Sequence, residues 1–477
     1  MIETLAPYPA YRASGIPWVD VAPDHWNTRR LRHVCDLRVS NVDKHVTPGE
    51  IPVRVCNYVH AYKNERITAR LGLSAGTVRP AELLRFRIYP GDVLITKDSE
   101  TWTDIGVPSL VQLDAPDLVC GYHLAILRPR LGMVGAYLHR ALQTPSIARQ
   151  LHAEASGVTR FGLTLGAINA ITLPLPPPDE QAAIVRFLDW ATRRIDRAIR
   201  AKRKLVSLVT EQKQAVIHRA VTRGLDPHAP MKDSGIPWLG EIPAHWQVRR
   251  LGSLFRERGE QNARGDITEV LSLLRGRGVI PYADKGNIGN KKSEDITRYK
   301  IVRPDDIVLN CMNIIIGSVG LSKYTGCLSP VYYVLVRNNG ADSPHYLNAV
   351  FQCSRFHKSL IRIGKGILAH RMRIPMELLK CELLPYPPSA EQEKIISALT
   401  EATRDLDATI TRTQRQIDLL REYRARLVAD VVTGKLDVRA AAAALPDEAP
   451  DDGEPLAPDD DDAADDDVDA TDAPDEG

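Results

Sequence analysis

The chain has 477 residues, of which 44% are hydrophobic and 26% charged, a composition typical of a globular protein of about three domains. No apolar run approaches the roughly 18 residues of a membrane span, and the N-terminus lacks a basic-then-apolar signal segment. We therefore expect a cytoplasmic protein with no membrane partner. Seven cysteines without a C-x-x-C pair argue against a disulfide framework or a Cys-rich zinc site.

The net charge of +2 conceals a strong asymmetry along the chain. Residues 446–477 contain 16 Asp or Glu and no Lys or Arg, so residues 1–445 carry 62 basic against 44 acidic groups, a net charge of +18. A body this basic favours a polyanionic partner such as nucleic acid, although an unbalanced solvent-exposed surface would give the same count. The acidic segment is predicted to be a disordered tail, either a DNA mimic or, as we favour, a solubility tail.

The sequence repeats itself in order along its length. Ser14-Gly-Ile-Pro-Trp18 recurs as Ser234-Gly-Ile-Pro-Trp238, and the match extends through residue 31, with 11 identities in 18 positions. Four further segments recur at offsets of 209–214: 89–96 with 303–310, 137–143 with 346–352, 174–184 with 385–395, and 221–226 with 432–437. A period of about 210 residues predicts a tandem duplication of two homologous modules, because solenoid repeats are far shorter.

Each module ends in a long helical segment that follows a proline-rich stop. Asp179 is expected to be the N-cap of the first helix, and Ser389 with Gln392 to form a capping box in the second. Apolar residues then recur at alternating spacings of four and three, which predicts a coiled coil. The predicted seams are Ile184, Leu188, Ala191, Ile195, Ala198, Lys202, Leu205, Val209, Gln212 and Val216, and Ile395, Leu399, Ala402, Leu406, Thr409, Thr413, Gln416, Leu420, Tyr423 and Leu427.

The simplest partner for each long helix is the other one. Antiparallel packing would place one module at each end of the pair and give the chain an approximate two-fold axis. The alternative is that each helix packs on its own module.

The first part of each module is predicted to have a mixed α/β (α+β) fold. Short apolar runs at 92–95, 306–309, 123–127 and 332–336 indicate strands, and 135–151 and 344–361 show helical spacing. Polar, Gly-containing loops separate these elements, and such loops commonly carry recognition residues.

Motifs of catalysis are absent from the sequence. There is no phosphate-binding G-x-x-x-x-G-K-[ST] loop, no H-E-x-x-H and no G-x-S-x-G elbow, and the single G-x-G at 364–366 is a weak signal. Glu211 with Lys213, the nearest approach to a nuclease carboxylate–lysine pair, falls in the first long helix and is expected to be a solvated helical pair. We therefore predict no catalytic residue, no metal site and a bivalent binding protein.

Three motifs, each present in both copies, resemble one known family. The entry segment 232–246, Lys-Asp-Ser-Gly-Ile-Pro-Trp-Leu-Gly-Glu-Ile-Pro-Ala-His-Trp, is similar to that of target-recognition domains in the DNA specificity (S) subunits of type I restriction–modification systems. The Pro-Pro-x-x-Glu-Gln start and the Val-Thr-x-x-Leu-Asp end of each long helix resemble the same family. The resemblance covers about residues 14–437 and leaves out the acidic tail.

The resemblance implies two target-recognition domains, each recognising one half of a bipartite, asymmetric site on double-stranded DNA. It implies that the antiparallel coiled-coil helices set the spacer between the halves and dock two methyltransferase (M) subunits, and that motor-nuclease (R) subunits join to cut DNA. S-adenosylmethionine, ATP and Mg²⁺ would then belong to those partners, and this chain would hold no cofactor. The implied divisions are 14–175 and 234–386 for the recognition domains, 178–226 and 389–437 for the helices, and 446–477 for the tail.

Candidate DNA contacts come from the repeat itself. Arg160 falls opposite Arg371, and each follows a Gly-containing stretch, so we predict a loop in each module that presents an arginine to DNA. The full candidate set is Arg160, Thr159, Lys97, Arg371, His370 and Lys365. The alternative for the arginines is an ion pair inside the fold.

The repeated tryptophans, Trp18 with Trp26 and Trp238 with Trp246, have several possible roles. They could form the methyltransferase-docking surface or stack on bases, but we favour anchors of the entry segment in the core of each module.

Two other classes of protein stay open at this point. One is a restriction enzyme subunit with an unrecognised nuclease site, and the other is an adaptor that bridges two identical partners without binding DNA. Selection of a two-part DNA motif with a fixed gap would favour the specificity subunit over both.

Overall fold

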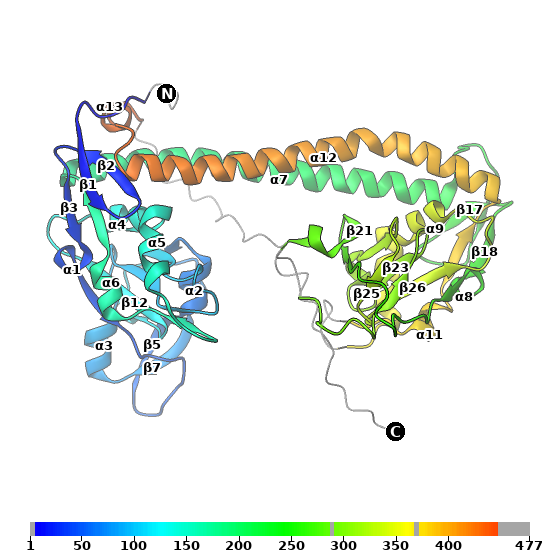
Figure 1. Cartoon of the computed structure of the whole chain (residues 1–477), viewed down its shortest axis with the longest axis horizontal. Coiled ribbons are helices and arrows are strands. Elements are labelled where there is room, and N and C mark those ends of the chain that lie inside the picture. The colour runs from blue at the N-terminus through cyan, green and yellow to red at the C-terminus, as the bar shows by residue number, and fades with distance from the viewer. Residues whose placement is uncertain (1–4, 287–290, 367–371, 447–477) are drawn as a thin grey trace. The chain divides into compact units, whose positions relative to one another are not determined.

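The computed structural model describes residues 5–286, 291–366 and 372–446, and the chain divides into two compact units (Figure 1). Of the described residues, unit 1 comprises 5–201 and 416–446, and unit 2 comprises 202–286, 291–366 and 372–415. Each unit therefore contains one globular part and one half of each long helix. Residues 447–477, the predicted tail, lie outside the described part of the chain.

Two long helices, α7 (Pro178–Arg223) and α12 (Ser389–Val432), account for the predicted helical segments. In unit 1, the seam residues Ile184, Leu188 and Ala191 of α7 are fully buried. Leu205, however, is 44% exposed, so the regular seam predicted through the middle of α7 is wrong there. Its neighbours explain this, because 202–204 is a Lys-Arg-Lys run that favours solvent.

The two helices pack together antiparallel, as contacts inside each unit show. In unit 1, Arg424 Nε lies 3.4 Å from Asp196 Oδ1, and Arg439 beyond the end of α12 lies 3.9 Å from Glu180 at the start of α7. In unit 2, Lys213 Nζ lies 2.6 Å from Asp407 Oδ1. The prediction that Lys213 pairs along its own helix with Glu211 is therefore wrong, because a carboxylate on the partner helix is in direct reach.

The helix starts are built differently from the predicted caps. α7 begins at Pro178, whose fixed φ suits the first helical position, so Asp179 is already inside the helix and is not its N-cap. The Gln181 side chain accepts a hydrogen bond from Val134 N and donates to the carbonyls of Gly132 and Pro176.

Gln392 makes the same kind of contacts in unit 2. It accepts from Ser343 N and donates to Pro387 O, so the capping box predicted for it with Ser389 is not what its side chain forms. The repeated Glu-Gln motif thus ties each helix start to the loop before a short helix of the neighbouring domain.

Unit 1 is a mixed α/β structure centred on a five-stranded sheet of order β4-β12-β8-β10-β6. Its strands are β4 (Cys35–Val39), β12 (Leu124–Pro129), β8 (Val93–Thr96), β10 (Pro108–Val111) and β6 (Arg66–Ile67). Smaller sheets join β1 (Tyr11–Ile16) to β2 (Val19–Pro23), β3 (Asn27–Arg30) to β15 (Thr172–Leu175), β11 (Leu118–Cys120) to β5 (Ile51–Cys56) and β7 (Ser74–Val78), and β13 (Ser156–Gly157) to β14 (Phe161–Gly162) and β9 (Asp98–Ser99). Pairing is antiparallel except between β10 and β6 and between β11 and β5.

Short helices complete unit 1. They are α1 (Leu31–Val34), α2 (Tyr58–Lys63), α3 (Pro80–Phe86), α4 (Gly135–Leu142), α5 (Pro145–Glu154), α6 (Leu165–Ala170) and α13 (Arg439–Ala443). The single helix predicted over 135–151 is thus two helices, because Pro145 cannot continue α4 and instead starts α5. Both α2 and α4 pack against the central strand β8.

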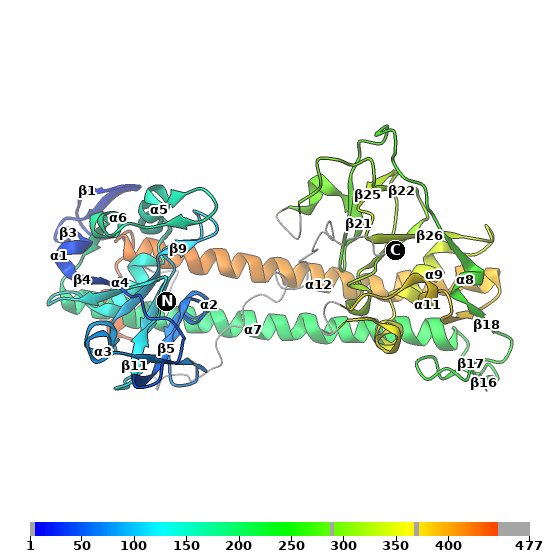
Figure 2. The same ribbon diagram turned by 90° about the horizontal axis from the view of Figure 1, so that it is seen from below.

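Unit 2 has a four-stranded antiparallel sheet of order β19-β26-β23-β24. Of these strands, β26 is labelled in Figure 2. Its strands are β19 (Phe255–Glu257), β26 (Tyr332–Arg337), β23 (Ile307–Asn310) and β24 (Val319–Leu321). Two-stranded sheets pair β16 (Met231–Asp233) with β17 (Glu241–Pro243), β18 (Gln247–Arg250) with β27 (Leu383–Tyr386), β20 (Leu271–Leu274) with β21 (Gly278–Pro281), and β22 (Lys300–Val302) with β25 (Gly326–Leu328). The helices are α8 (Leu251–Leu254), α9 (Pro344–Phe351), α10 (Ser354–Ser359) and α11 (Met376–Leu379), with 3-10 turns η2 (Tyr282–Lys285), η3 (Ile314–Ile316) and η4 (Leu360–Ile363).

The four predicted strands all exist, as β8, β12, β23 and β26, within one or two residues of the expected bounds. Two of these strands, β8 and β23, occupy matching places in the two copies, and each directly follows an aspartate that has a structural role. Asp92, 2% exposed, accepts two hydrogen bonds from Arg128 and one from Tyr89 N. In unit 2, Asp306 accepts two from Arg258 and one from Arg303 N. Each buried carboxylate is thereby paired and hydrogen-bonded, as burial of a charge requires.

Candidate nucleic-acid interface

In unit 1 the predicted recognition loop is the tip of a β-hairpin formed by β13 and β14. Gly157 pairs with Phe161, and β14 in turn pairs with β9, so the hairpin is anchored on the end of a central strand segment. Gly157 has φ +154, and a Cβ added there would lie 1.9 Å from the carbonyl oxygen of Arg160. Only glycine fits this tight return of the chain. The tip therefore exposes Val158, Thr159 and Arg160 to solvent.

Arg160 has no carboxylate partner within ion-pair distance among residues 5–286, 291–366 and 372–446. Its charge acts on Tyr58, where it opposes the rise in the tyrosine pKa that burial causes. An exposed, uncompensated guanidinium on a rigid hairpin is suited to a phosphate or a guanine edge. Contact of Arg160 and Thr159 with DNA stays a prediction.

Lys97 lies at the base of the same hairpin, and its charge is used inside the protein. Its Nζ is 2.6 Å from Asp98 Oδ2, and His123 Nδ1 is 2.5 Å from the same oxygen. Burial raises the pKa of Asp98, but the hydrogen bonds from Lys97 and His123 outweigh this and lower it. Because Lys97 is only 23% exposed and already paired, it holds the hairpin base in shape more directly than it offers a charge to DNA.

Aromatic side chains around the hairpin were not found from the sequence. Tyr58 and Tyr62 of α2 stack with ring centroids 5.5 Å apart, and Tyr62 donates to Asp104. Trp102 is 51% exposed, and Tyr122 is 47% exposed beside His123, which has the unusual φ of +66. No spacing marks these residues, because they come from one helix and two separate loops. A non-glycine residue in this backbone region is typical of functional sites.

Unit 2 builds a hairpin base at the corresponding place. Lys365 and Arg373 exchange two backbone hydrogen bonds of 2.9 and 3.0 Å, and Gly366 has φ +145. Lys365 is exposed. The two other candidates, His370 and Arg371, lie outside the described residues. Below the hairpin, Ile374 N donates to Cys311 O at 2.9 Å, as Leu163 N donates to Lys97 O at 2.8 Å in unit 1.

A second exposed basic tip in unit 2 was missed. Arg275 and Arg277 flank Gly276 in the turn between β20 and β21, and both side chains are exposed. Gly276 and Gly278 have φ of +75 and +74. The Arg-Gly-Arg-Gly sequence was a signal for this turn, because glycine at such φ values is typical of tight hairpins.

Three of the four tryptophans proposed as a docking surface are buried. Trp26 is 1%, Trp238 8% and Trp246 0% exposed, so these side chains are core anchors, as the favoured interpretation expects. Trp246 Nε1 donates to Glu391 of α12 at 3.0 Å. Trp18 differs, since it is 55% exposed with φ +60 in the turn between β1 and β2. A docking role therefore stays a prediction for Trp18 alone.

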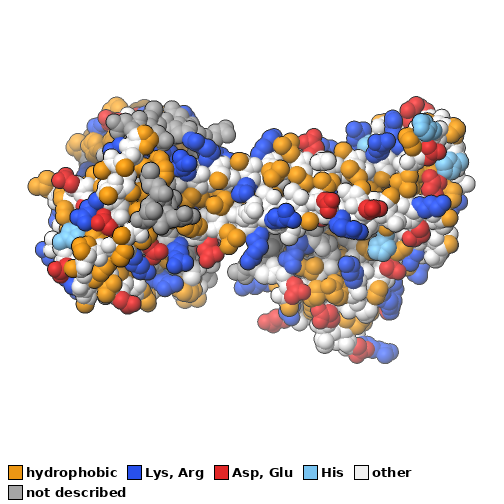
Figure 3. Space-filling view, turned by 90° about the horizontal axis from the view of Figure 1, so that it is seen from above, with side chains coloured by type: hydrophobic (Ala, Val, Ile, Leu, Met, Phe, Trp, Pro, Cys, Tyr) orange, Lys and Arg blue, Asp and Glu red, His pale blue; other side chains and the backbone are white. Residues whose placement is uncertain are grey.

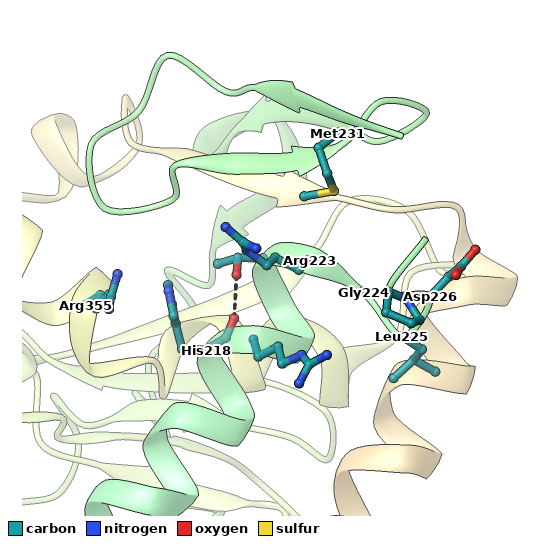
Figure 4. Close-up of a pocket in the computed structure, with 10 residues that line it drawn as sticks. His218, Arg223, Gly224, Leu225, Asp226, Met231 and Arg355 are labelled. Carbon is teal, nitrogen blue, oxygen red and sulfur yellow. Dashed lines mark hydrogen bonds between the residues drawn. The ribbon is translucent and has the colours of Figure 1, made fainter. Parts of the chain in front are cut away.

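A cationic cavity of about 500 Å³ lies in unit 2 at the C-terminal end of α7 (Figure 4). Its lining includes His218, Arg219, Arg223 and Arg355, and Figure 4 shows His218 and Arg355 on facing elements. Burial, followed by Arg355 and Arg223, lowers the pKa of His218. The recess adds basic surface to unit 2.

Two kinds of site are absent from the parts of the chain with described coordinates. No group of three or more His, Cys, Asp or Glu side chains there could hold a metal ion. Nor does any helix there have the length and apolar character to cross a membrane. Each unit, taken by itself, combines a mixed α/β domain that has an exposed basic tip with one half of each long helix.

Comparison with known proteins relates the chain to one class of protein, the specificity subunits of restriction systems. No protein-family model matches the chain. A Methanocaldococcus jannaschii type I restriction enzyme MjaX specificity subunit is 21% identical over 428 residues, covering 87% of this chain and 95% of that protein. The MjaIX specificity subunit of the same organism is 20% identical, with 87% and 94% coverage.

Solved structures were compared with the chain as well, and the first of them shares its fold. A chain from work on complex assembly and conformational transition of the type I R-M system covers 87% of this chain and 99% of its own, with a TM-score of 0.57 and 17% identity. The HsdS subunit of Thermoanaerobacter tengcongensis covers 87% and 98%, with a TM-score of 0.40 and 17% identity. The sequence matches and the fold shared with the first of these structures make the chain similar to the specificity subunits of type I restriction–modification systems.

Proposed function

We propose that this chain is the DNA specificity subunit of a type I restriction–modification complex, in which each unit recognises one half of a bipartite, asymmetric site. The observation that carries the proposal is the hairpin base that the fold builds in both units, with Arg160 exposed and unpaired at the described tip. Arginines on rigid tips supply phosphate and base-edge contacts. Two linked binding surfaces gain affinity from each other when their span fits the site.

Reciprocal contacts support the tandem duplication and the pseudo-two-fold pairing of the helices. Asp196 of α7 approaches Arg424 of α12, and the matching positions at an offset of 211 are Asp407 of α12 and Lys213 of α7, which also form an ion pair. Exchange of the same two positions between two elements is the pattern that a two-fold axis produces.

The helix ends repeat this exchange. Gly434, with φ +77 after α12, lies against Trp26, so that an added Cβ would be 3.0 Å from the indole. Gly224, with φ +67 after α7, lies against Trp246, and a Cβ added there would be 3.2 Å from its indole. Each helix thus ends on the entry motif of the other copy, which accounts for both recurring motifs at once.

The partners follow from the same proposal. Two methyltransferase subunits would dock on the long helices, where exposed apolar side chains lie among Lys and Arg (Figure 3). Leu205 and Leu208 of α7 and Leu419 and Tyr423 of α12 are 41–50% exposed. Motor-nuclease subunits would join that assembly and bring ATP and Mg²⁺ chemistry, while S-adenosylmethionine would bind the methyltransferases. The chain itself would position them and catalyse nothing.

The proposal is tested by selection from a random duplex library with the full chain, alone and with its methyltransferase partner. Enrichment of a two-part motif with a fixed gap is the expected result. Metal-dependent cleavage by the chain alone would instead identify an enzyme, and absence of any enrichment in both samples would identify a protein adaptor.

Arg160→Ala is expected to weaken binding to the selected duplex roughly 5- to 150-fold, because one bidentate arginine contact contributes about 1–3 kcal/mol. Competition binding at fixed salt measures this. Arg29→Ala, an exposed arginine on β3, is the matched control and should bind as the unmodified chain does. Equal affinity of Arg160→Ala and the unmodified chain for both half-sites would remove Arg160 from the interface.

A further inference from the structure

In unit 1 a network of charged residues joins the recognition domain to both long helices. We call this set the ionic clasp and define it as Glu65, Arg66, Arg140, Asp189, Asp196 and Arg424. Its centre is Arg140 of α4, which is buried and donates to Asp189 Oδ1 of α7 at 2.7 Å and to Thr192 Oγ1 at 3.3 Å. Arg66 of β6 donates to the same Asp189 oxygen at 2.8 Å.

The clasp reaches the second helix through Glu65, which directly precedes β6. Arg424 of α12 donates to Glu65 Oε1, and Arg140 Nη1 lies 3.7 Å from Glu65 Oε2. Arg424 also lies 3.4 Å from Asp196 of α7, although this pair is not in hydrogen-bond geometry. Three carboxylates and three guanidinium groups therefore connect one domain to two helices.

The charges of the clasp depend on one another. Burial raises the pKa of Asp189, but Arg140 and Arg66 outweigh it and hold that pKa below its usual value. For Glu65, burial is likewise outweighed by Arg424 and Arg140. Asp196 has the opposite balance, because burial raises its pKa more than Arg424 lowers it. Charge-assisted contacts of this kind are directional, so they fix an orientation as well as a contact.

Unit 2 attaches its domain to the helices in another way. The repeat places Ala349 opposite Arg140 and Thr400 opposite Asp189, so neither charge of the central pair exists there. Instead, Tyr346, Val350 and Phe351 of α9 share one hydrophobic cluster with side chains of both helices, among them Val221 of α7 and Ile395 of α12. An apolar contact has less directional preference than an ionic one.

We propose that the ionic clasp determines which spacer length the subunit accepts, by fixing the orientation of the first recognition domain on the helices. The proposal rests on the proposed function. One added base pair moves a half-site by roughly 3.4 Å and rotates it by roughly 35°. A rigidly oriented domain rejects that displacement, whereas a domain free to pivot follows it. Arg140, Asp189, Glu65 and Arg424 are therefore positioning residues and need not touch DNA.

The test uses the full chain with its methyltransferase partner and duplexes carrying both selected half-sites at the preferred spacing and at one base pair more or less. Asp189→Asn keeps the shape of the side chain and removes its charge, and Arg140→Met removes the central guanidinium. We expect the preference for the correct spacing over its neighbours to fall at least about tenfold in both variants, with the half-site sequences unchanged.

Lys213→Met is the matched control, since it breaks an ion pair between the same helices in unit 2 without releasing a domain. It should keep the full spacing preference. An unchanged preference in a folded Asp189→Asn variant would overturn the proposal, as would an equal loss of affinity at every spacing. Failure of the unmodified chain to select any two-part site would instead reject the proposed function, and the clasp with it.

Discussion

Replacing Trp246 by alanine is expected to lower the free energy of unfolding of unit 2 by roughly 3–5 kcal/mol. Its indole is fully buried in the cluster that includes Val221 of α7, Tyr346 of α9 and Ile395 of α12. The indole N–H donates to Glu391 Oε1, and Oε2 of the same carboxylate is 2.8 Å from His245 Nε2. The substitution therefore leaves a cavity where two helices and a domain meet and removes a hydrogen bond from a partly buried carboxylate.

This loss is measured by urea unfolding, with hydrogen exchange of peptides from unit 2 as the detection method. Trp18→Ala is the matched control, because the same residue type in the first copy is 55% exposed. It should change stability by no more than about 0.5 kcal/mol. If Trp18 contacts the methyltransferase, that variant will still lose affinity for the partner while Trp246→Ala loses stability. Comparable stability of Trp246→Ala and the unmodified chain would refute the anchoring role.

Local sequence signals were sufficient for the elements with regular patterns. Alternating three and four spacings located α7 and α12, and short apolar runs located β8, β12, β23 and β26. The Gly-containing stretch before Arg160 indicated a tip, and the structure shows why, since Gly157 closes the hairpin against the carbonyl of Arg160. In these cases the information lies within a few residues, where propensity and backbone geometry decide the structure.

Contacts between residues that are far apart in the sequence could not be predicted from the sequence alone. Glu65 and Arg424 are separated by 359 positions, and no periodicity links them. Glu211 is an acidic residue two positions from Lys213, but the ion-pair partner of Lys213 is Asp407, which is 194 positions away. Gln392 has the spacing of a capping box, but a free backbone N–H of another segment competes for its side chain. Polar side chains have several equivalent partners, and tertiary packing selects among them.

Acidification is expected to destabilise unit 1 through His139 of α4. This side chain is 1% exposed, and its Nε2 has no hydrogen-bond partner among the described residues. Burial and then Arg140 lower its pKa from 6.5 to about 3, although Glu65 and Asp189 oppose them. The folded unit therefore holds His139 neutral while the unfolded chain protonates it near pH 6.5. The contribution of this pKa shift to the free energy of unfolding is fully present above that pH. It is lost as the pH falls toward 3, by roughly 4–5 kcal/mol in total.

The range from pH 7 to pH 5 keeps the contribution of Glu65 small, because this carboxylate, with its pKa lowered to about 2, stays ionised in the folded unit and is still about three quarters ionised in the unfolded chain at pH 5. Over that range His139 alone should cost about 2 kcal/mol, a roughly 30-fold rise in the opening constant of α4 amides by hydrogen exchange. His139→Asn is the test, since Asn348 occupies the matching position of the second copy and does not titrate. The variant should show a smaller pH dependence for α4 and no change for α9, where burial lowers the pKa of nearby His357 to about 4 in both proteins. If the opening constant of α4 amides depends on pH equally in the variant and the unmodified chain, then other histidines of unit 1, such as His60 and His152, cause the loss of stability at low pH.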